Sequence, residues 1–385
     1  MPDIGPLAYG RYANEFVAAM KAADPSIKVG VVLTAPGNWP DQEVNGTPPP
    51  WNPNVITTTC ANIDFVDVHW YPQDPKSGGG QGGVGETDAN LLGSPENGIA
   101  GRTASIPTMV AHLRAELAQY CPGRASQIQI MITETNAVSY NPGKQTVSLV
   151  NALFADDSYM TWLENGVVNV DWWQLHNSPV TPTMGANLDP SLYGDATFGD
   201  YGILSNGESP EPAANTPFPA YYGLRMLGKF AAPGDDMLAT SSSSNLITAH
   251  AVKRPDGSIA VLLINKDPAN RYDVTLNLPG YSTGPTRTVY AYGKGSSIGL
   301  GSDGLSQTTE PTSSSVAVEP YSLTTLVLTP NAGGPGGPGG PGGPGGPGGP
   351  GGGATPELGS GELLAIGLVP VVLAVALQRR RRRKA

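Results

Sequence analysis

The chain has 385 residues, a formal net charge of −10 and only 14% charged residues. This length accommodates about two domains with a sizeable core. Six of the 22 basic residues lie in the stretch 379–384, so the rest of the chain is more acidic still. Because phosphate binding needs clustered Lys and Arg on a folded surface, nucleic acid is excluded as a partner. Low charge combined with many aromatic and amide side chains suits a neutral, hydroxyl-rich ligand. The four histidines are scattered and form no cluster with cysteine, so we expect neither a metal site nor a cofactor.

Residues 1–232 alternate helical patterns with short apolar strands. Helices are predicted at "YANEFVAAMKAADP" (12–25), "TMVAHLRAELAQYC" (108–121), "TVSLVNALFADDSYMTWLENG" (146–166) and "PAYYGLRMLGKFA" (219–231), and strands within "IKVGVVLTAP" (27–36), "ITTTCANIDFVDVHWYP" (56–72), "QIQIMITET" (127–135) and "VVNVDWWQLHN" (167–177). Helix and strand in turn, with crossovers this long, predict βα units and a parallel sheet.

The strand predicted over 127–135 is wholly apolar from Ile130 to Ile132 and then stops at a carboxylate, Glu134. In parallel α/β folds, functional residues lie at the carboxyl ends of strands, where loops surround a pocket. Glu134 is therefore either a functional carboxylate at that edge or a residue that leaves the sheet for solvent. This segment alone leaves both interpretations open.

The two cysteines, Cys60 and Cys121, each precede a predicted strand. Residues that enter adjacent strands of one sheet lie at the same rim, so a disulfide is possible in an oxidising compartment. Two buried free thiols are the alternative.

Residues 237–330 change character and consist of β-type runs separated by turn residues. Pro-Asp-Gly at 255–257, between two such runs, is a hairpin signal. We predict a small antiparallel β-sandwich here. Six Pro-Gly-Gly repeats follow over 333–353, and these act as a spacer because they cannot bury a core.

The C-terminal tail combines an apolar stretch, 363–377, with five consecutive arginines. As a helix this stretch is about 22 Å long, short of a ~30 Å hydrocarbon core, but extension to 358–378 makes a membrane span feasible. The tail resembles bacterial C-terminal sorting signals, in which a short motif, an apolar stretch and an arginine cluster hold a protein at the membrane, although no LPxTG motif is present. We therefore expect an extracellular protein that is anchored to the bacterial envelope by its C-terminal segment.

Four strand ends, "VVLTAPGNW", "DFVDVHWYP", "MITETN" and "VDWWQLHN", followed by a β-sandwich, resemble the second half of a (β/α)8-barrel glycoside hydrolase of clan A. Arabinofuranosidase-like members are the most similar, and xyloglucan- or cellulose-active endoglucanases come next. The likeness covers residues 1–330 and implies an α/β fold: strands five to eight of a barrel, then an antiparallel sandwich. The expected domains are 1–232 and 237–330, followed by the linker 333–353, the membrane segment 358–378 and the basic tail 379–385.

In that clan, strand seven ends in the catalytic nucleophile, which the resemblance places at Glu134. A carboxylate at a barrel mouth can attack the anomeric carbon if an acid about 5–5.5 Å away protonates the leaving oxygen. His69 and Tyr71 of the preceding strand would line the same mouth, with Tyr71 placed to hydrogen-bond the nucleophile.

Aromatic faces, amides and a second imidazole are expected to bind the sugar. The residues are Asn38, Trp39, Trp70, Asn136, Trp173, Gln174 and His176. Because alternate strand residues face opposite ways, one of the adjacent pair Trp172 and Trp173 is expected in the core.

The acid/base glutamate of the clan ends strand four in an Asn-Glu pair, and this chain offers Asn14-Glu15. Apolar residues recur at helical spacing around Glu15 and no strand-like run precedes it, so Glu15 is predicted to be an exposed residue of the helix leading into strand five. We therefore expect the chain to begin past the true acid. Strands one to four, the acid and a signal peptide would be missing together, and the chain as written would have little hydrolase activity.

These features predict a retaining glycoside hydrolase that acts on plant cell-wall-type polysaccharide, represented by a C-terminal fragment. Two other functions stay open: a non-catalytic carbohydrate-binding surface protein, and a structural surface protein whose linker and anchor are the functional parts. The runner-up chemistry is inversion, which needs carboxylates about 6.5–9.5 Å apart. The runner-up specificity is that of an endoglucanase.

Overall fold

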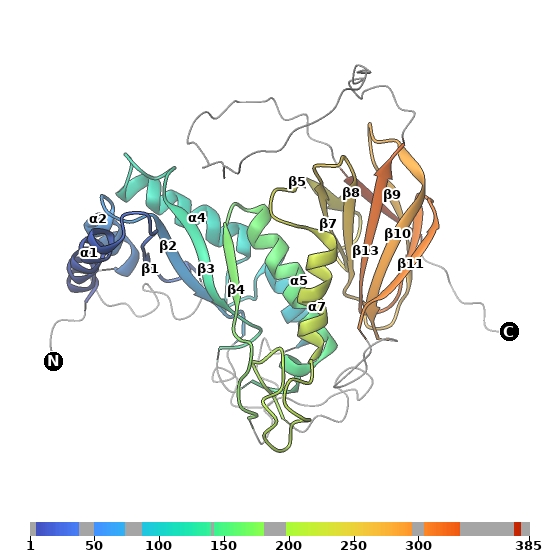
Figure 1. Ribbon diagram of the computed structural model, residues 1–385, viewed down its shortest axis with the longest axis horizontal. Helices are drawn as coiled ribbons and strands as arrows, with labels where there is room; N and C mark the ends of the chain where they lie inside the picture. Colours follow the sequence, from blue (N-terminus) through green and yellow to red (C-terminus); the bar gives the residue numbers. More distant parts are fainter. Residues whose placement is uncertain are drawn as a thin grey trace, which may run out of the picture.

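The computed structural model describes residues 5–37, 50–73, 87–139, 142–180, 198–294, 304–331 and 373–378. A four-stranded parallel sheet in the order β1-β2-β3-β4 forms its first part (Figure 1). The strands are β1 (Gly30–Val32), β2 (Phe65–Trp70), β3 (Gln129–Thr135) and β4 (Asn169–Trp172). The helices are α1 (Pro6–Ala23), α2 (Trp51–Thr59), α3 (Asp88–Asn97), α4 (Ile106–Tyr120), α5 (Leu149–Glu164) and α7 (Pro219–Phe230), with the 3-10 turn η2 (Lys144–Val147) before α5. The predicted alternation of helix and strand and the parallel sheet are confirmed.

One face of the sheet is packed against helices and the other is open. Val68 of β2 and Ile132 of β3 are fully buried in a core shared with Leu113 of α4 and Phe154 of α5. On the opposite face His69 remains exposed. Among the described residues β1 and β4 each pair on one side only, so the sheet is an open arc with helices on its outer face.

The first helix, α1, turns its apolar side chains outward. Tyr12, Phe16 and Met20 are 55%, 68% and 45% exposed, whereas the buried residues of the helix are Pro6, Ala8, Gly10 and Val17. A Cβ at Gly10 would lie 2.8 Å from Thr58, so this glycine allows α1 to approach α2 closely. The prediction that Glu15 is an exposed residue of a helix leading into the first strand is confirmed.

The second part is antiparallel except for the pair β14 and β6, and it comprises a six-stranded sheet, β11-β10-β13-β8-β7-β5, and a four-stranded sheet, β12-β9-β14-β6. Its strands are β5 (Asp236–Leu238), β6 (Thr240–Ser242), β7 (Ile247–Lys253), β8 (Ile259–Asn265), β9 (Tyr272–Asn277), β10 (Thr283–Gly293), β11 (Ser306–Pro311), β12 (Ser315–Val318), β13 (Ser322–Pro330) and β14 (Leu373–Gln378). The predicted hairpin is present: β7 pairs with β8, and Gly257 between them has φ +82°, a conformation that glycine adopts without strain. Helices α5 and α7 lie between the two parts (Figure 1).

The predicted membrane segment 358–378 falls largely outside the described residues, as does the linker 333–353. The described portion, Leu373–Gln378, forms a strand and not the expected helix: it pairs in parallel with β6 and antiparallel with β9. Periodicity alone does not distinguish a strand from a helix in a short apolar run, which explains the difference. Within the described ranges, no helix is long and apolar enough to span a membrane.

The two cysteines form a disulfide, which resolves the alternative left open by the sequence. Cys60 and Cys121 follow the ends of α2 and α4, with their Cα atoms 5.5 Å apart. Each lies shortly before the strand that its helix feeds, β2 or β3, and those strands are neighbours. The bond therefore fixes two adjacent crossovers at the same rim of the sheet.

Buried charges connect α5 to the sandwich. Asp157 of α5 accepts from His250 Nε2 of β7 at 3.0 Å and lies 2.5 Å from Lys266 Nζ, just after β8. Glu164 and Glu96 contact the other sides of these two cations, at 2.8 Å each. Because both cations are nearly solvent-free, the network ties the two parts together through contacts that water does not screen.

Candidate active site

The strand β3 contains one residue more than its neighbours can pair with. Val68 pairs with Ile132, but the next residue of β2, His69, pairs with Glu134 and not with Thr133. The pairing with β4 skips at the same place. Thr133 is therefore a β-bulge. Side chains alternate along a strand, so without the bulge Glu134 would point into the helix-covered core with Ile132; with it, Glu134 turns to the open face beside His69.

Asp67 holds this bulge in place. Its Oδ1 accepts hydrogen bonds from the backbone N–H of Thr133 at 3.2 Å and from the Thr133 hydroxyl at 2.5 Å. Asp67 is only 8% exposed and lies two residues before His69, on the same face of β2. Sequence reasoning missed it. The period-two spacing of Asp67 and His69 was the available signal.

Two side chains from the end of β2 contact the Glu134 carboxylate. The Tyr71 hydroxyl donates a short hydrogen bond to Oε1, and His69 Nδ1 lies 3.2 Å from Oε2. The other imidazole nitrogen of His69 is 3.7 Å from Asp67 Oδ2. Burial, followed by the hydrogen bond to Glu134, raises the pKa of Tyr71 well above its ordinary value, so the phenol stays protonated and acts as a donor. Glu134 remains part-exposed, at 23% of its side chain.

A second tyrosine, Tyr201, supports the first from a loop after β4. The rings of Tyr71 and Tyr201 meet edge to face, with centroids 6.4 Å apart. The backbone carbonyl of Tyr201 accepts from the N–H of Gln174 at 2.9 Å, which fixes the loop against the end of β4. Sequence reasoning missed Tyr201, because its loop shows no periodic pattern.

Two of the expected sugar-binding residues lie in the interior, and those expectations are corrected. Trp70 is fully buried between Phe154 and Trp162, because it follows His69 and so faces the opposite way. Asn136 is also fully buried: its amide donates to the carbonyl of Trp173 at 2.6 Å and so connects the ends of β3 and β4.

The adjacent tryptophans at the end of β4, Trp172 and Trp173, face opposite ways, as their spacing predicts. Trp172 packs against Phe154 and Tyr159, with ring centroids 6.2 Å away in both cases. Trp173 is 40% exposed and is on the same side of the sheet as Glu134, because it is one residue further along. It therefore has a face available for a ligand.

The remaining predicted site residues are bound to protein partners or lie outside the described chain. The Gln174 amide donates to Asn177 Oδ1 at 2.8 Å, and His176 Nε2 lies 2.9 Å from Asn215 Oδ1. Asn38 and Trp39 fall outside the described residues. Among the residues that the structure describes, no group of three or more His, Cys, Asp or Glu side chains is placed to hold a metal ion.

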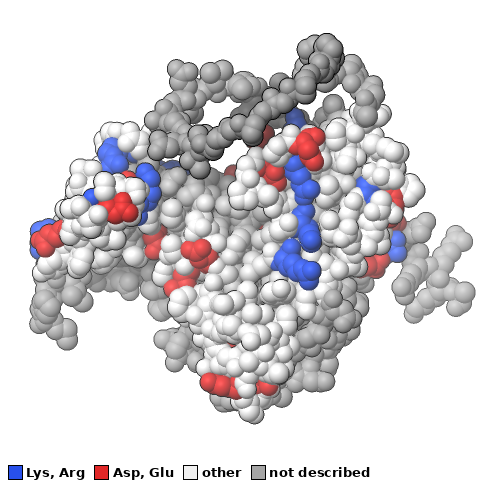
Figure 2. Space-filling model, viewed as in Figure 1, with Lys and Arg blue, Asp and Glu red and all other residues white. Residues whose placement is uncertain are grey.

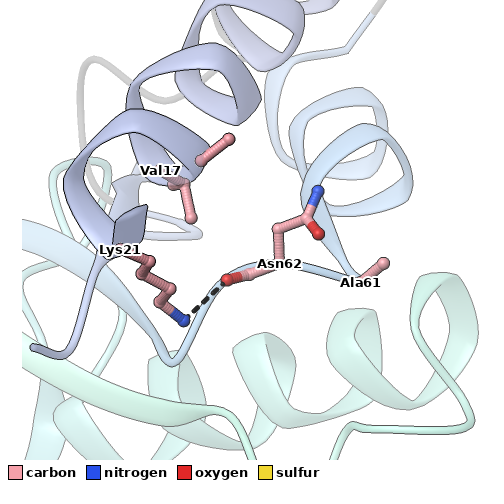
Figure 3. Close-up of a pocket in the computed structure, with 5 residues that line it drawn as sticks. Val17, Lys21, Ala61 and Asn62 are labelled. Atoms are coloured by element: carbon pink, nitrogen blue, oxygen red, sulfur yellow. Dashed lines mark hydrogen bonds between the residues drawn. The ribbon is translucent and has the colours of Figure 1, made fainter. Parts of the chain in front are cut away.

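A separate cavity of about 290 Å³ lies between α1 and the loop after α2, lined by Val17, Ala18, Lys21, Ala61 and Asn62 (Figure 3). The Lys21 ammonium donates to the carbonyl of Asn62 at 3.1 Å and is 2.7 Å from Asp64, just before β2. This cavity is at the amino ends of the strands, opposite the Glu134 edge, where side chains of parallel barrels serve stability. The face of the molecule in Figure 2 shows scattered acidic groups and a connected row of basic side chains among mostly neutral ones.

Comparison with known proteins gives a likeness of fold alone. No family model matches the sequence, and no curated protein matches it. An α-L-arabinofuranosidase from Thermotoga maritima, solved with arabinose, superimposes with a TM-score of 0.58 at 15% identity, covering 84% of this chain and 62% of that one. A family 51 α-L-arabinofuranosidase from Bifidobacterium longum gives 0.55 at 14%, with 84% and 63% covered. A Paenibacillus polymyxa xyloglucanase of glycoside hydrolase family 44 gives 0.53 at 14%, with 85% and 61% covered.

This chain shares its fold with parts of these arabinofuranosidases and of the xyloglucanase. It spans less than two thirds of the length of each of these solved chains.

Proposed function

We propose that this chain carries the nucleophile of a retaining glycoside hydrolase that acts on plant cell-wall-type polysaccharide, with arabinofuranosidase-like specificity. The observation that carries the proposal is Glu134, which the Thr133 bulge turns to the open face at the carboxyl edge of the sheet, where Tyr71 donates to it. The named activities of the similar structures, arabinofuranosidases and a xyloglucanase, support the substrate class.

In this proposal Glu134 attacks the anomeric carbon and forms a glycosyl-enzyme, which water then hydrolyses. Tyr71, kept protonated, holds one carboxylate oxygen, so that the other is presented to the sugar. Trp173 offers its exposed face to the C–H side of the sugar ring.

The general acid would be supplied by a segment beyond the residues of this chain, which pairs with the open edges of the sheet. Three observations support this: the outer edges of β1 and β4 have no paired strand among the described residues, the apolar face of α1 is exposed, and each similar structure is longer than this chain. The chain alone is therefore expected to hydrolyse unactivated substrates poorly.

The test uses a sugar whose leaving group departs without protonation, because this isolates the nucleophile from the acid. The chain is incubated with a 2-deoxy-2-fluoro-arabinofuranosyl fluoride, and its intact mass and peptide map are measured. We expect one added fluorosugar on Glu134, and none on a Glu134→Gln variant of equal thermal stability. An unlabelled wild-type chain, or label elsewhere in the sequence, would refute the proposal.

The alternative of a non-catalytic carbohydrate-binding protein is favoured by exposed Trp173 alone. It predicts that Glu134→Gln retains oligosaccharide affinity while no label forms on the wild type. Calorimetric titration with arabino- and xyloglucan oligosaccharides, carried out on both proteins, separates the two functions.

We also propose an extracellular location with attachment to the bacterial envelope through residues 358–385. The Cys60–Cys121 disulfide supports an oxidising compartment, and the arginine cluster after a Pro-Gly spacer supports attachment. Fractionation of cells that express the full chain or a chain ending at residue 331 tests this. Attachment predicts that the shortened chain leaves the membrane fraction in folded form. A shortened chain that unfolds would instead show that β14 serves the sandwich.

A further inference from the structure

A row of basic side chains follows α7. Figure 2, seen from the same side as Figure 1, shows this connected row along the helix. Arg225 and Lys229 are four residues apart and so project from the same face of α7. Arg254, in the turn between β7 and β8, continues the row. Its guanidinium donates to the carbonyls of Lys229 and Phe230, at 2.6 and 3.0 Å, where the helix ends.

Both cations of α7 lie toward β10 and β11. Lys229 Nζ is 5.5 Å from the ring centroid of Tyr290 in β10, within the range of a cation–π contact. Arg225 extends to the residues just before β11, because a Cβ at Gly304 would lie 3.4 Å from its Nη1. The positive charges of the helix are therefore held beside the outer two strands of the six-stranded sheet.

The face of β10 and β11 beside these cations is polar and open. Tyr290 points to the α7 side of the sheet, since Lys229 lies over its ring. Gln307 is directly opposite Tyr290 in the register, and Thr309 is opposite Thr288, two residues earlier in β10. Opposite residues of an antiparallel pair point to the same face, and both Gln307 and Thr309 are exposed. An aromatic ring, an amide and a hydroxyl therefore share one face with the cations.

No ion pair neutralises the two cations of α7 within the described part of the chain. The helix contains no acidic residue, and β10 and β11 contain only Glu310. Glu310 is opposite Arg287, on the other face of the sheet, and accepts from it at 2.6 Å. Among the described residues, the side chains of Arg225 and Lys229 take part in no ion pair. They form an unpaired positive surface on a chain whose net charge is −10.

We propose that this face, the α7–β11 surface, binds an acidic polysaccharide whose sugar units carry carboxylates, that is, uronic acids. A planar guanidinium pairs with a carboxylate through two parallel hydrogen bonds, and an ammonium adds a second charge. The tyrosine ring offers apolar area to the C–H side of a sugar, while the amide and the hydroxyl bind sugar hydroxyls. The residues of the α7–β11 surface are Arg225, Lys229, Tyr290, Gln307 and Thr309.

The composition of the α7–β11 surface favours a glycan over a lipid bilayer. A protein surface that binds in the membrane interface places exposed aromatic or aliphatic side chains beside its cations. The large exposed hydrophobic residues of the described chain lie on α1, beside the strands of the parallel sheet and on β5, and none lies on α7, β10 or β11. The surface instead combines cations, hydrogen-bonding groups and one half-buried tyrosine, Tyr290, which suits a hydrated acidic sugar.

The binding site goes beyond the proposed hydrolase and does not depend on Glu134. It adds acidic glycans to the neutral ligands that the overall composition suggests, because the charge of the whole chain conceals a local row of cations. An acidic chain held at the sandwich would keep the enzyme on its polysaccharide. That consequence rests on the proposed function, whereas the binding itself does not.

Calorimetric titration of the full chain with an oligogalacturonate tests the site. We expect binding that weakens as the salt concentration rises from about 0.1 to 1 M, because the Debye length falls from about 10 to 3 Å. A fully methyl-esterified oligogalacturonate keeps the sugars and loses the charges, so it should bind about tenfold more weakly or less.

Arg225→Gln with Lys229→Gln removes two charges and keeps hydrogen-bonding groups. The affinity for oligogalacturonate should fall about 3- to 30-fold, the sum of two exposed ion pairs. Arg225→Gln alone, at an exposed position, covers the case in which the double variant does not fold. The matched control is Arg11→Gln with Lys28→Gln, two exposed charges on and after α1, which should leave the affinity within about twofold. Glu134→Gln should bind as the wild type does.

A wild-type chain that does not bind oligogalacturonate, equal affinities for the acid and its methyl ester, or equal losses in the two double variants would overturn the α7–β11 surface as a glycan site. Vesicles of phosphatidylserine and phosphatidylcholine are titrated in parallel. Vesicle binding that is tighter than oligogalacturonate binding and is lost in the Arg225 and Lys229 variant would also overturn it, in favour of a membrane. Retained oligogalacturonate binding without fluorosugar labelling of Glu134 would leave this site standing and refute the proposed function.

Discussion

Glu134 lies directly opposite His69 in the register of β3 and β2, one residue later along β3 than an unbroken pairing would place it. The offset is produced entirely by Thr133, and Asp67 stabilises it through two hydrogen bonds to that residue. The direction of the Glu134 side chain therefore depends on the bulge at Thr133 and on Asp67, which holds that bulge. This makes the bulge the first feature to test.

Replacing Thr133 with Val keeps its shape and removes the hydroxyl that donates to Asp67. The buried carboxylate then loses a charge-assisted hydrogen bond, which we expect to lower the free energy of unfolding by about 1–3 kcal/mol. Urea denaturation measures this. Thr108→Val, at an exposed position of α4, is the matched control and should change stability by no more than about 0.5 kcal/mol. Equal losses in the two variants would show that Asp67 does not hold the bulge.

Tyr71→Phe removes the donor to Glu134 while keeping the ring that contacts Tyr201. Hydrogen bonds to charged groups contribute about 1.5–3 kcal/mol, so labelling of Glu134 by the activated fluorosugar should slow by about 10- to 100-fold. Because burial and Glu134 raise the pKa of Tyr71, its hydroxyl stays protonated and causes no loss of labelling up to its ordinary pKa of 10.0. Tyr12→Phe, at an exposed site on α1, should leave the rate unchanged. A Tyr71→Phe rate within about twofold of wild type would remove Tyr71 from the mechanism.

Lys266→Met tests the buried charges between α5 and the sandwich. The change leaves Asp157 with one cation fewer in a site without solvent, and breaking a buried pair in this way costs about 3–5 kcal/mol. Chemical denaturation gives the value. The control is Lys253→Met, at an exposed position of β7, which should be neutral within about 0.5 kcal/mol. If the two substitutions lower the free energy of unfolding equally, the network does not join the two parts.

The same network predicts how stability varies with pH. Burial alone lowers the pKa of His250, but the Glu164 charge and the hydrogen bond to Asp157 outweigh it and raise the value to about 10. A raised folded-state pKa means that the stabilisation is complete below 6.5 and is lost as the pH rises through about 10. Thermal melts across this window should therefore show a falling midpoint in the wild type. His250→Gln should flatten that fall, and an unchanged slope would contradict the assignment.

Local pattern was sufficient for the helices, the parallel sheet, the hairpin at 255–257 and the place of Glu134 at the carboxyl edge, because each depends on periodicity or turn chemistry within a few residues. Local pattern was insufficient where the direction of a side chain depends on contacts with residues far away in the sequence. A period-two reading of 130–134 points Glu134 into the core, and only the pairing with β2 reveals the bulge. The sequence predicted that Trp70 binds sugar, but Trp70 is buried against Trp162 of α5. Local sequence does not reveal such a tertiary contact. Tyr201 comes from an aperiodic loop, and no local signal predicts the contact of its ring with Tyr71.

The exposed apolar face of α1 leads to the last prediction. Substitutions on this face should have different effects in this chain and in a longer one. Phe16 and Met20 are 68% and 45% exposed, so Phe16→Gln with Met20→Gln should leave the stability of this chain within about 0.5 kcal/mol and reduce its self-association, as measured by light scattering after size exclusion. Ala22→Gln, on another face of α1, is the control.

In a chain extended by the proposed completing segment, the face that carries Phe16 and Met20 would be buried. The two substitutions should then lower the free energy of unfolding by about 2–5 kcal/mol per large side chain. If the extended chain tolerates both substitutions as well as the shorter one does, the segment does not pack on α1, and the open edges of β1 and β4 must be covered in some other way.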